Sequence, residues 1–229
     1  MPTIVFASPK GGVGKSTSAV LLATELAVRG VDVTIIDADP NRPVSRWAKR
    51  PNKPPSLTVV ADITQETIIP EIEAAAARSA FVIVDLEGTA SMTVGFALSR
   101  ADLVIIPTKG SMLDATEAIK AIKLLRAQEL AFRRTIPAAI LFTQTNQAIR
   151  PRTLRHIEAQ LEQSGVPVLK TPLYDRDAFR AVFVFGGGGS TLDPGEVSKI
   201  PNAKANAEAF MREVVQMLKA GAPKLAEVA

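Results

Sequence analysis

The sequence predicts an α/β protein: a doubly wound, mostly parallel sheet with helices on both faces. Apolar runs rich in β-branched residues alternate with helical patterns along the chain. Several of these runs have no polar side, as is typical of strands that helices cover on both faces. The chain has 229 residues, of which 47% are hydrophobic and 22% charged, enough for one substantial core.

The pattern assigns the elements in order. The expected strands are Thr3–Ser8, Val31–Asp37, Leu57–Val60, Phe81–Asp85, Leu103–Pro107, Ile136–Thr143 and Val166–Leu169. The expected helices are Ser16–Arg29, Glu66–Arg78, Ser91–Ser99, Leu113–Glu129, Pro151–Gln163 and Asn202–Ala220. Gly30 and Gly165 follow two of these helices and are natural C-terminal caps. In sheets of this kind ligands bind at the carboxyl ends of the strands, so we expect the site there.

Two segments between these elements are expected to be loops. Pro40–Ser56 is rich in proline and basic residues, and Phe185–Gly195 contains four consecutive glycines. Because ordering glycine costs much conformational entropy, we expect the second segment to be either a mobile surface loop or one ordered by a partner or a nucleotide.

A glycine-rich motif lies between the first expected strand and the first expected helix. It reads Ser8-Pro9-Lys10-Gly11-Gly12-Val13-Gly14-Lys15-Ser16-Thr17. Strand, glycine-rich turn and helix are the context of a phosphate-binding loop, in which backbone N–H groups and the helix N-terminus attract an anion. In such a loop Lys15 reaches the outer phosphates and the Ser16 hydroxyl binds Mg²⁺. The motif therefore predicts binding of a nucleoside triphosphate.

The form of this motif is specific. Pro9 stands where the common pattern has its first glycine, and a second lysine, Lys10, precedes Gly11. In this form the motif resembles the deviant Walker A loop of the ParA/MinD family of ATPases. The resemblance implies that ATP binds to the loop residues Lys10, Gly11, Gly12, Val13, Gly14, Lys15, Ser16 and Thr17. It also implies that Lys10 reaches across a homodimer to the phosphates of the partner's ATP. Two neighbouring ammonium groups repel each other, and a triphosphate carries enough negative charge for both.

Carboxylates end two of the apolar strands. Asp37 and Asp39 end the second strand, and Asp85 ends the fourth. Mg²⁺ prefers oxygen ligands and keeps several waters, so carboxylates near the phosphate-binding loop suit it. By resemblance, Asp85 is the Walker B aspartate that holds a Mg²⁺-bound water, Asp39 orients the attacking water, and Asp37 supports Mg²⁺ or the loop. The expected metal residues are Ser16, Asp37 and Asp85, and the expected catalytic residues are Lys10, Lys15 and Asp39. Hydrolysis then proceeds by positioning and charge stabilisation.

The sequence departs from the common family pattern in two loops. Leu86-Glu87-Gly88-Thr89 follows the Walker B aspartate where many members have Thr-Pro-Pro, and it places an extra carboxylate near the metal. Asn41-Arg42-Pro43 replaces the usual Gln-Gly-Asn, and this variant resembles ParA-like proteins of conjugative and T-DNA transfer systems. The segment 174–180 resembles the same branch and the small plasmid partition ATPases. In relatives the adenine is bordered by loops whose counterparts here contain Thr143, Asn146, Pro172 and Tyr174.

Two basic clusters mark candidate surfaces for a polyanion, in a chain whose formal net charge is +4. One contains Arg126, Arg133, Arg134, Arg150, Arg152 and Arg155. The other surrounds Trp47, the only tryptophan, with Arg42, Arg46, Lys49, Arg50 and Lys53. Each is either a solvated face or a surface for DNA phosphates. Because family members bind DNA nonspecifically as ATP-bound dimers, we favour for DNA the residues Arg133, Arg134, Arg150, Arg152 and Arg155. For the Trp47 cluster, contact with a protein partner and simple packing of Trp47 both stay open.

The composition of the chain indicates where in the cell the protein is expected. The chain has no cysteine, which excludes disulfides, thiolate metal sites and a cysteine-bound iron–sulfur cluster. No apolar run approaches the roughly 20 residues needed to cross a bilayer, and no signal peptide precedes the first strand. We therefore expect a cytoplasmic protein, associated with the nucleoid when ATP is bound. Residues 1–229 are expected to form one ATPase domain without an N-terminal helix-turn-helix region.

Several functions fit these features. The resemblance implies first a DNA partition ATPase, an ATP-bound homodimer on nonspecific DNA that hydrolyses ATP when a centromere-bound, ParB-like adaptor stimulates it. The alternative is an accessory ATPase of conjugative or T-DNA transfer, which binds near a transfer origin and recruits the relaxase complex. A MinD-like membrane regulator needs an amphipathic C-terminal segment, and the tail 220–229 is short and contains Pro223, so no membrane partner is expected. A relative of dethiobiotin synthase needs a small-substrate pocket, which the sequence leaves open.

Overall fold

The computed structural model describes residues 1–88, 91–149, 151–163, 165–193, 195 and 197–220. Its centre is a seven-stranded sheet in the order β3-β2-β4-β1-β5-β6-β7, and all neighbouring strands pair in parallel. The strands are β1 (Thr3–Phe6), β2 (Val33–Ala38), β3 (Leu57–Val60), β4 (Phe81–Leu86), β5 (Leu103–Thr108), β6 (Ala138–Thr145) and β7 (Leu173–Tyr174). The predicted α/β class is confirmed, and the sheet is parallel throughout.

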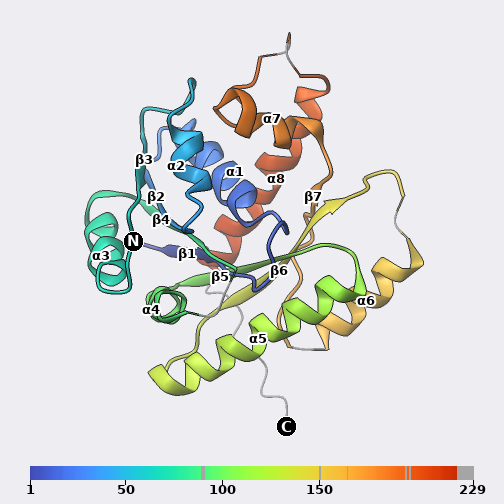
Figure 1. Cartoon of the computed structure of the whole chain (residues 1–229). Helices are drawn as coiled ribbons and strands as arrows, with labels where there is room; N and C mark the ends of the chain where they lie inside the picture. The colour runs from blue at the N-terminus through green and yellow to red at the C-terminus, as the bar shows by residue number, and fades with distance from the viewer. Residues whose placement is uncertain (89–90, 150, 164, 194, 196, 221–229) are drawn as a thin grey trace.

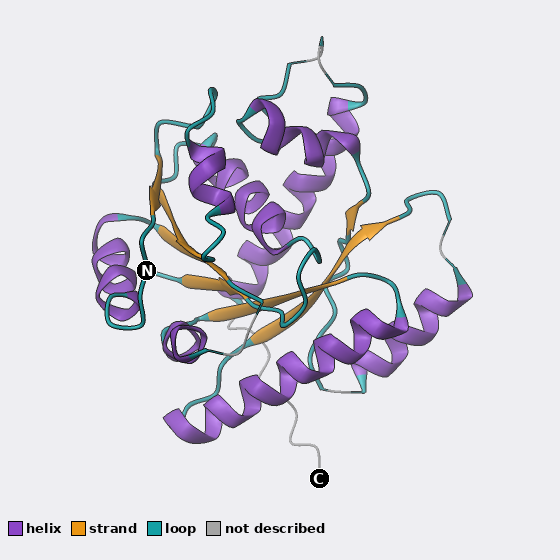
Figure 2. Cartoon of the chain, in the orientation of Figure 1, coloured by secondary structure: helices purple, strands orange, loops and turns teal. Residues whose placement is uncertain are grey.

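Helices cover both faces of this sheet (Figures 1 and 2). One face carries α1 (Lys15–Ala27), α2 (Pro43–Ala48), α7 (Asp177–Phe185) and α8 (Ile200–Lys219). The other carries α3 (Ile68–Arg78), α4 (Met92–Ser99), α5 (Met112–Phe132) and α6 (Arg152–Glu162). This is the doubly wound arrangement that the alternating pattern predicts. No helix in the described part of the chain is long and apolar enough to cross a bilayer.

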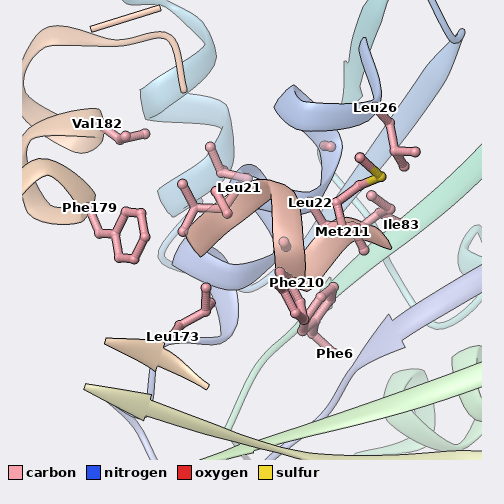
Figure 3. Close-up of a cluster of buried hydrophobic side chains, with 14 of the residues drawn as sticks. Phe6, Leu21, Leu22, Leu26, Ile83, Leu173, Phe179, Val182, Phe210 and Met211 are labelled. Atoms are coloured by element: carbon pink, nitrogen blue, oxygen red, sulfur yellow. The ribbon is translucent and has the colours of Figure 1, made fainter. Parts of the chain in front are cut away.

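Two apolar cores join the sheet to its helices. Successive side chains of β1 alternate between them, since Ile4 and Phe6 lie in the core under α1 and Val5 lies in the core under α5. Figure 3 shows part of the first core, where Phe6, Leu22 of α1 and Phe210 of α8 belong to one cluster. All three side chains are fully buried. The carboxyl edge of the sheet is therefore held from both faces, and the loops at this edge start from fixed positions.

Two helices and the last strand differ from the expectation. α2 forms inside the segment expected to be a loop, with Pro43 in its first turn, where an N–H group has no helical acceptor. α7 has no counterpart among the expected elements. The strand expected at Val166–Leu169 is wrong, because Val168 forms only an isolated bridge to Ile140 and the seventh strand is β7 instead.

The four consecutive glycines after α7 are packed against α1, α8 and the segment that follows α2. Gly186 to Gly189 are all buried, so the expectation of a surface loop is wrong. A Cβ atom on Gly188 would lie 2.2 Å from the Thr24 hydroxyl oxygen on α1, and only glycine permits this close approach. The Trp47 indole, 1% exposed, donates a hydrogen bond from Nε1 to the Gly187 carbonyl at 2.9 Å. Trp47 is thus a packed residue that joins α2 to the glycine segment.

Candidate nucleotide-binding site

The phosphate-binding loop connects β1 to α1, as the motif predicts. Gly14 caps the helix with φ = 90°, a left-handed conformation that side chains with a Cβ rarely adopt. Lys15 is the first residue of the helix and is 7% exposed. Its ammonium donates hydrogen bonds to the carbonyl oxygens of Ser8 and Lys10, both at 3.3 Å. The loop therefore wraps around the lysine that would contact the outer phosphates.

Strand β6 supports this loop from behind. The buried Thr143 hydroxyl donates to the Val13 carbonyl at 2.7 Å and lies 3.2 Å from the Thr108 carbonyl. The neighbouring Gln144 donates from Nε2 to the Gly12 carbonyl at 3.2 Å. These bonds tie the carbonyl oxygens of Gly12 and Val13 to β6 and leave the N–H groups of the loop free of them. Thr143, which the resemblance assigns to the adenine, is therefore first a support of the loop.

The two predicted strand-end carboxylates lie side by side. Asp37 on β2 and Asp85 on β4 are partners in the parallel register, and both are buried. Burial raises the pKa of Asp85 to about 7, against the Ser16 hydroxyl and the Lys15 ammonium, which lower it; the charge of Asp37 raises it further. Burial also lowers the pKa of Lys15, and the carboxylates around it oppose this only in part.

Asp37 and Asp39 have different local partners. One oxygen of Asp37 accepts hydrogen bonds from the backbone N–H of Ser45 at 2.7 Å and from its hydroxyl at 2.6 Å. Burial raises the pKa of Asp37, and the Ser45 bonds lower it less. Asp37 thus anchors α2 at the site. Asp39 is partly exposed, and its Oδ1 accepts from the Asn41 backbone N–H at 2.8 Å, which fixes the turn after β2.

The unpaired oxygens at this edge fit a hydrated cation. Both oxygens of Asp85 and Oδ1 of Asp37 are buried, and none has a hydrogen-bond partner among the described residues. Unpaired buried carboxylate oxygens are unfavourable, and a Mg²⁺-bound water would donate to them. Together with the Ser16 hydroxyl, this is the oxygen-only donor set that Mg²⁺ prefers.

A cavity of about 520 Å³ opens over the loop. Its lining contains Gly11, Gly12, Gly14, Lys15, Ser16, Thr17, Asp39, Pro40, Asn41, Glu87, Gly88 and Gln144. A hollow of about 320 Å³ is lined by the same Gly14, Thr17 and Gln144 together with Thr143, Tyr174 and Phe179. The two spaces are therefore contiguous, a polar one beside the loop and a less polar one beside α7. This is the division that a triphosphate and a base require.

The residues that the resemblance assigns to the adenine do not all meet in one place. Asn146 and Pro172 line a different hollow, of about 260 Å³, against α6, and of the four only Tyr174 lines both hollows. The Asn146 side chain accepts from the N–H groups of Ala148 and Ile149. Asn206 of α8 brackets the segment before α7, since it donates to the Pro172 carbonyl at 2.8 Å and accepts from the Tyr174 N–H at 3.0 Å.

Lys10 turns away from the cavity of its own chain. It is not among the residues that line the 520 Å³ space. Its ammonium lies 2.5 Å from Oδ1 of Asp114, in the first turn of α5. The second lysine of the motif is thus held beside the site and not inside it.

The basic cluster 126–155 is divided by strand β6. Arg133 ends α5 and precedes β6, whereas Arg152 and Arg155 follow β6 in the first turns of α6, at the opposite edge of the sheet. Arg134 donates from its guanidinium to the carbonyl oxygens of Ser99 and Ala101, so it ties α5 to the loop after α4. Arg133 therefore lies apart from Arg152 and Arg155, and the role of these arginines in DNA binding stays a prediction. Arg133, Arg152 and Arg155 are exposed, and Arg150 lies outside the described residues.

Sequence reasoning missed several residues that shape the site. Four residues contact predicted site residues that lie elsewhere in the sequence and are brought close by folding: Ser45, Asp114, Gln144 and Asn206. Gln144 and Asp114 lie 132 and 104 positions from their partners in the chain, and no local pattern marks such pairs. A signal was present for Ser45, eight residues after Asp37 at the start of a short helix with Pro43 in its first turn.

Comparisons with known proteins agree with this geometry. The family model described as VirC1 protein matches residues 1–218. A protein named ParA from Rhizobium radiobacter is 41% identical over 222 residues, which is 96% of this chain and 100% of that protein. A virC1 protein from Rhizobium rhizogenes is 31% identical over 191 residues, 80% of each chain. The ATP complex of a McdA variant from Cyanothece has a TM-score of 0.74 at 15% identity and covers 94% of this chain and 96% of that one. The chain belongs to the VirC1/ParA family of deviant Walker A ATPases.

Proposed function

We propose that this protein is a DNA partition ATPase that forms a homodimer around two ATP molecules and binds DNA without sequence preference. A centromere-bound, ParB-like adaptor then stimulates hydrolysis. One observation carries the dimer in this proposal: Lys10 does not line the phosphate cavity of its own chain, although it belongs to the same motif as Lys15. An ammonium at that position can enter the cavity of a second chain.

The roles of the site residues follow from their positions. Lys15 and the N–H groups of the loop hold the phosphates, and the hollow beside Tyr174 and Phe179 takes the adenine. Ser16, Asp85 and Asp37 would hold Mg²⁺ through their oxygens, directly or through bound water. When bound, Mg²⁺ neutralises negative charge on the phosphates.

Asp39 is proposed to orient the attacking water. It borders the phosphate cavity, and its Oδ1 accepts from the Asn41 N–H, whereas no described residue donates a hydrogen bond to its other oxygen. The other oxygen is available to accept a hydrogen bond from water. Glu87 borders the same cavity and adds a second carboxylate there. Its position favours slow turnover in the isolated protein, because extra negative charge near the phosphates opposes the developing charge.

Exposed apolar side chains beside the site support the homodimer. Met92 is 59% exposed at the start of α4, and Met112 and Leu113 are 50% and 76% exposed at the start of α5. These helices begin at the carboxyl edge of the sheet, and Asp114, the partner of Lys10, follows Leu113 directly. Large apolar groups that gather at one edge of a soluble protein mark an interaction surface. A second copy that covers them also brings its Lys10 to this edge.

Two exposed basic surfaces are candidates for DNA. The first turns of α6 present Arg152 and Arg155, which the sequence analysis favours. The α2 surface presents Arg46, Lys49 and Arg50, all exposed. Either surface would bind phosphates and lose affinity steeply with salt.

An accessory role in conjugative or T-DNA transfer is the second candidate. The match to the VirC1 family over residues 1–218 favours it, while the identity to the ParA protein over nearly the whole chain favours partition. The two functions share the site and differ in the DNA they need. Partition predicts equal affinity for random and origin DNA, and transfer predicts a preference for the origin with recruitment of a relaxase complex.

A titration of DNA with nucleotide tests the proposal. Binding of random and origin duplexes is measured by fluorescence anisotropy with no nucleotide, with ADP, and with a non-hydrolysable ATP analogue, and the oligomeric state is measured in parallel by sedimentation. We expect a dimer and tight binding to both duplexes only with the analogue. A monomer that ignores the analogue would overturn the proposal, and a strong preference for the origin duplex would select transfer over partition.

A further inference from the structure

Lys10 is held by a carboxylate that is far more buried than the lysine itself. The side chain of Asp114 is 5% exposed and that of Lys10 is 38% exposed. Lys10 Nζ and Asp114 Oδ1 are 2.5 Å apart, and among the described residues Asp114 forms an ion pair with Lys10 alone. The ion pair therefore joins a partly exposed lysine to a buried carboxylate.

Asp114 is itself fixed by the start of α5. Ser111 caps this helix, since its hydroxyl accepts from the Asp114 backbone N–H at 3.2 Å and also hydrogen-bonds the second carboxylate oxygen, Oδ2. Burial alone would raise the pKa of Asp114, but the Lys10 ammonium and the Ser111 hydroxyl outweigh it and hold this pKa below its usual value. Lys109 contributes in the same direction. The carboxylate is thus charged, and its two oxygens are held by Ser111 and Lys10 in the absence of a partner.

We propose that Asp114 is a positioning residue that retains Lys10 on its own chain. Lys10 is released only when the triphosphate bound to a partner chain takes the place of Asp114 as its anion. The proposal rests on the proposed function, because it concerns the same Lys10 that would enter the second chain. Asp114 does not contact nucleotide. It acts through Lys10 and sets how readily this lysine becomes available.

The exchange is selective because the release is unfavourable. When Lys10 leaves, the buried Asp114 keeps the Ser111 hydroxyl but loses its ammonium, and a buried carboxylate without its cation is strongly destabilising. Only a ligand with large negative charge offsets this loss for Lys10. A triphosphate offers more such charge than a diphosphate. The cost of release weakens the dimer equally with either nucleotide, so the weaker diphosphate dimer falls below measurable affinity and the triphosphate dimer remains.

The test compares Asp114→Asn with the wild-type protein. Asparagine keeps the shape and can still accept from Ser111, but it does not attract an ammonium. We expect the dimer dissociation constant with a non-hydrolysable ATP analogue to fall about tenfold, the effect of one charge-assisted hydrogen bond. We also expect a measurable dimer with ADP. Nucleotide affinity of the monomer, measured by calorimetry at low protein concentration, should be unchanged.

Two controls separate retention of Lys10 from a merely structural role. Ser111→Ala removes the helix cap and leaves the carboxylate, so it should lower the melting temperature without tightening the dimer. In the Lys10→Ala background, which is not expected to dimerise, Asp114→Asn should not restore the dimer, since the lysine to be released is absent; a restored dimer would show that Asp114 does not act through Lys10. Asp114→Ser serves as a second charge-removing variant if the asparagine variant does not fold.

The outcomes are distinguishable from those of the proposed function. If the wild-type protein dimerises with the analogue and Asp114→Asn dimerises equally or less well, Lys10 is not retained by Asp114, whereas the proposed function stands. If the wild-type protein stays monomeric and Asp114→Asn dimerises, retention is supported and the wild-type dimer is refuted. If neither protein dimerises, both proposals fail.

Discussion

Asp37 and Asp85 lie side by side at the same level of two adjacent parallel strands, β2 and β4. Both are buried carboxylates at the end of an apolar strand, yet their surroundings differ. Asp37 holds the start of α2 through Ser45, whereas neither oxygen of Asp85 has a hydrogen-bond partner among the described residues. The pair therefore divides into an anchor for the neighbouring helix and a buried carboxylate whose two oxygens are unpaired.

The unpaired state of Asp85 predicts a pH-dependent stability of the metal-free protein. Its pKa is raised from 3.8 to about 7 in the folded state, so between these values the folded protein binds the extra proton. Stability then falls as the pH rises from about 4 to about 7, by up to about 1.4 kcal/mol per pH unit, and levels off above. Melting temperatures measured across this range without Mg²⁺ check the prediction.

The matched variant for this prediction is Asp85→Asn, which does not titrate. Its melting temperature should vary less steeply than that of the wild-type protein over the same range, with the remaining slope due to Asp37 and other groups. Parallel curves for the two proteins would show that Asp85 does not take up the proton.

Lys15→Ala should weaken ATP binding by roughly a hundredfold or more, because the charge-assisted hydrogen bonds to the outer phosphates disappear. Calorimetry at low protein concentration measures this. Lys10→Ala is the control, since Lys10 lies outside the cavity of its own chain and its removal should leave monomer binding intact while preventing the dimer. Unchanged affinity in Lys15→Ala would refute the assignment of the loop.

Asp39→Ala should leave ATP binding intact and slow turnover by about a hundredfold or more, as expected when the group that orients water is removed. The ATP-bound dimer should then persist. Phosphate release and sedimentation with ATP and Mg²⁺ measure both effects. The role of Asp39 would be contradicted by normal phosphate release from a fully folded variant.

Charge reversal distinguishes the two basic surfaces. If DNA binds at α6, Arg152→Glu with Arg155→Glu should weaken it. The slope of log affinity against log salt should then become shallower by about 0.9 for each DNA phosphate that the variant no longer neutralises. Arg46→Glu with Lys49→Glu on α2 is the matched pair and should in that case have little effect. The reverse result would place the DNA on α2, and nucleotide affinity should be unchanged in both variants.

Gly188→Ala should destabilise the protein by about 1–3 kcal/mol, because a Cβ atom there collides with Thr24 on α1. The midpoint of denaturant unfolding measures this. Gly95→Ala within α4 is the control; its nearest neighbour is the flexible Gln128 side chain, so little change is expected. Equal midpoints for the two variants would mean that the glycine segment shifts to accommodate the added Cβ atom without loss of stability.

The elements that the sequence predicts well are those with a strong pattern of their own. Leu57–Val60 has the same bounds in the sequence and in the structure, and the loop between β1 and α1 lies where its motif places it. α2 and α7 escaped prediction for physical reasons. α2 has only six residues and depends on Asp37 and Trp47 for its position. α7 is rich in aromatic and valine side chains, which favour strands when no tertiary context is known.

The candidate site divides in the same way. The positions of the carboxylates and lysines could be predicted, because each lies at or just after the end of a strand or in the loop motif; their roles stay predictions. Their partners could not, since Thr143 reaches Val13 and Asp114 reaches Lys10 only after the sheet has formed. The basic cluster shows the opposite case. Arg133 and Arg152 are close in the sequence, but the whole of β6 lies between them.

The bond between the Trp47 indole and Gly187 provides a built-in optical reporter. The chain has a single tryptophan, so its emission comes from one known place, between α2 and the glycine segment. α2 in turn is held by Asp37 at the edge of the nucleotide site. Any event that moves α2 away from the glycines would let water reach the indole and change its emission wavelength, and the protein needs no added label for this to be followed in real time.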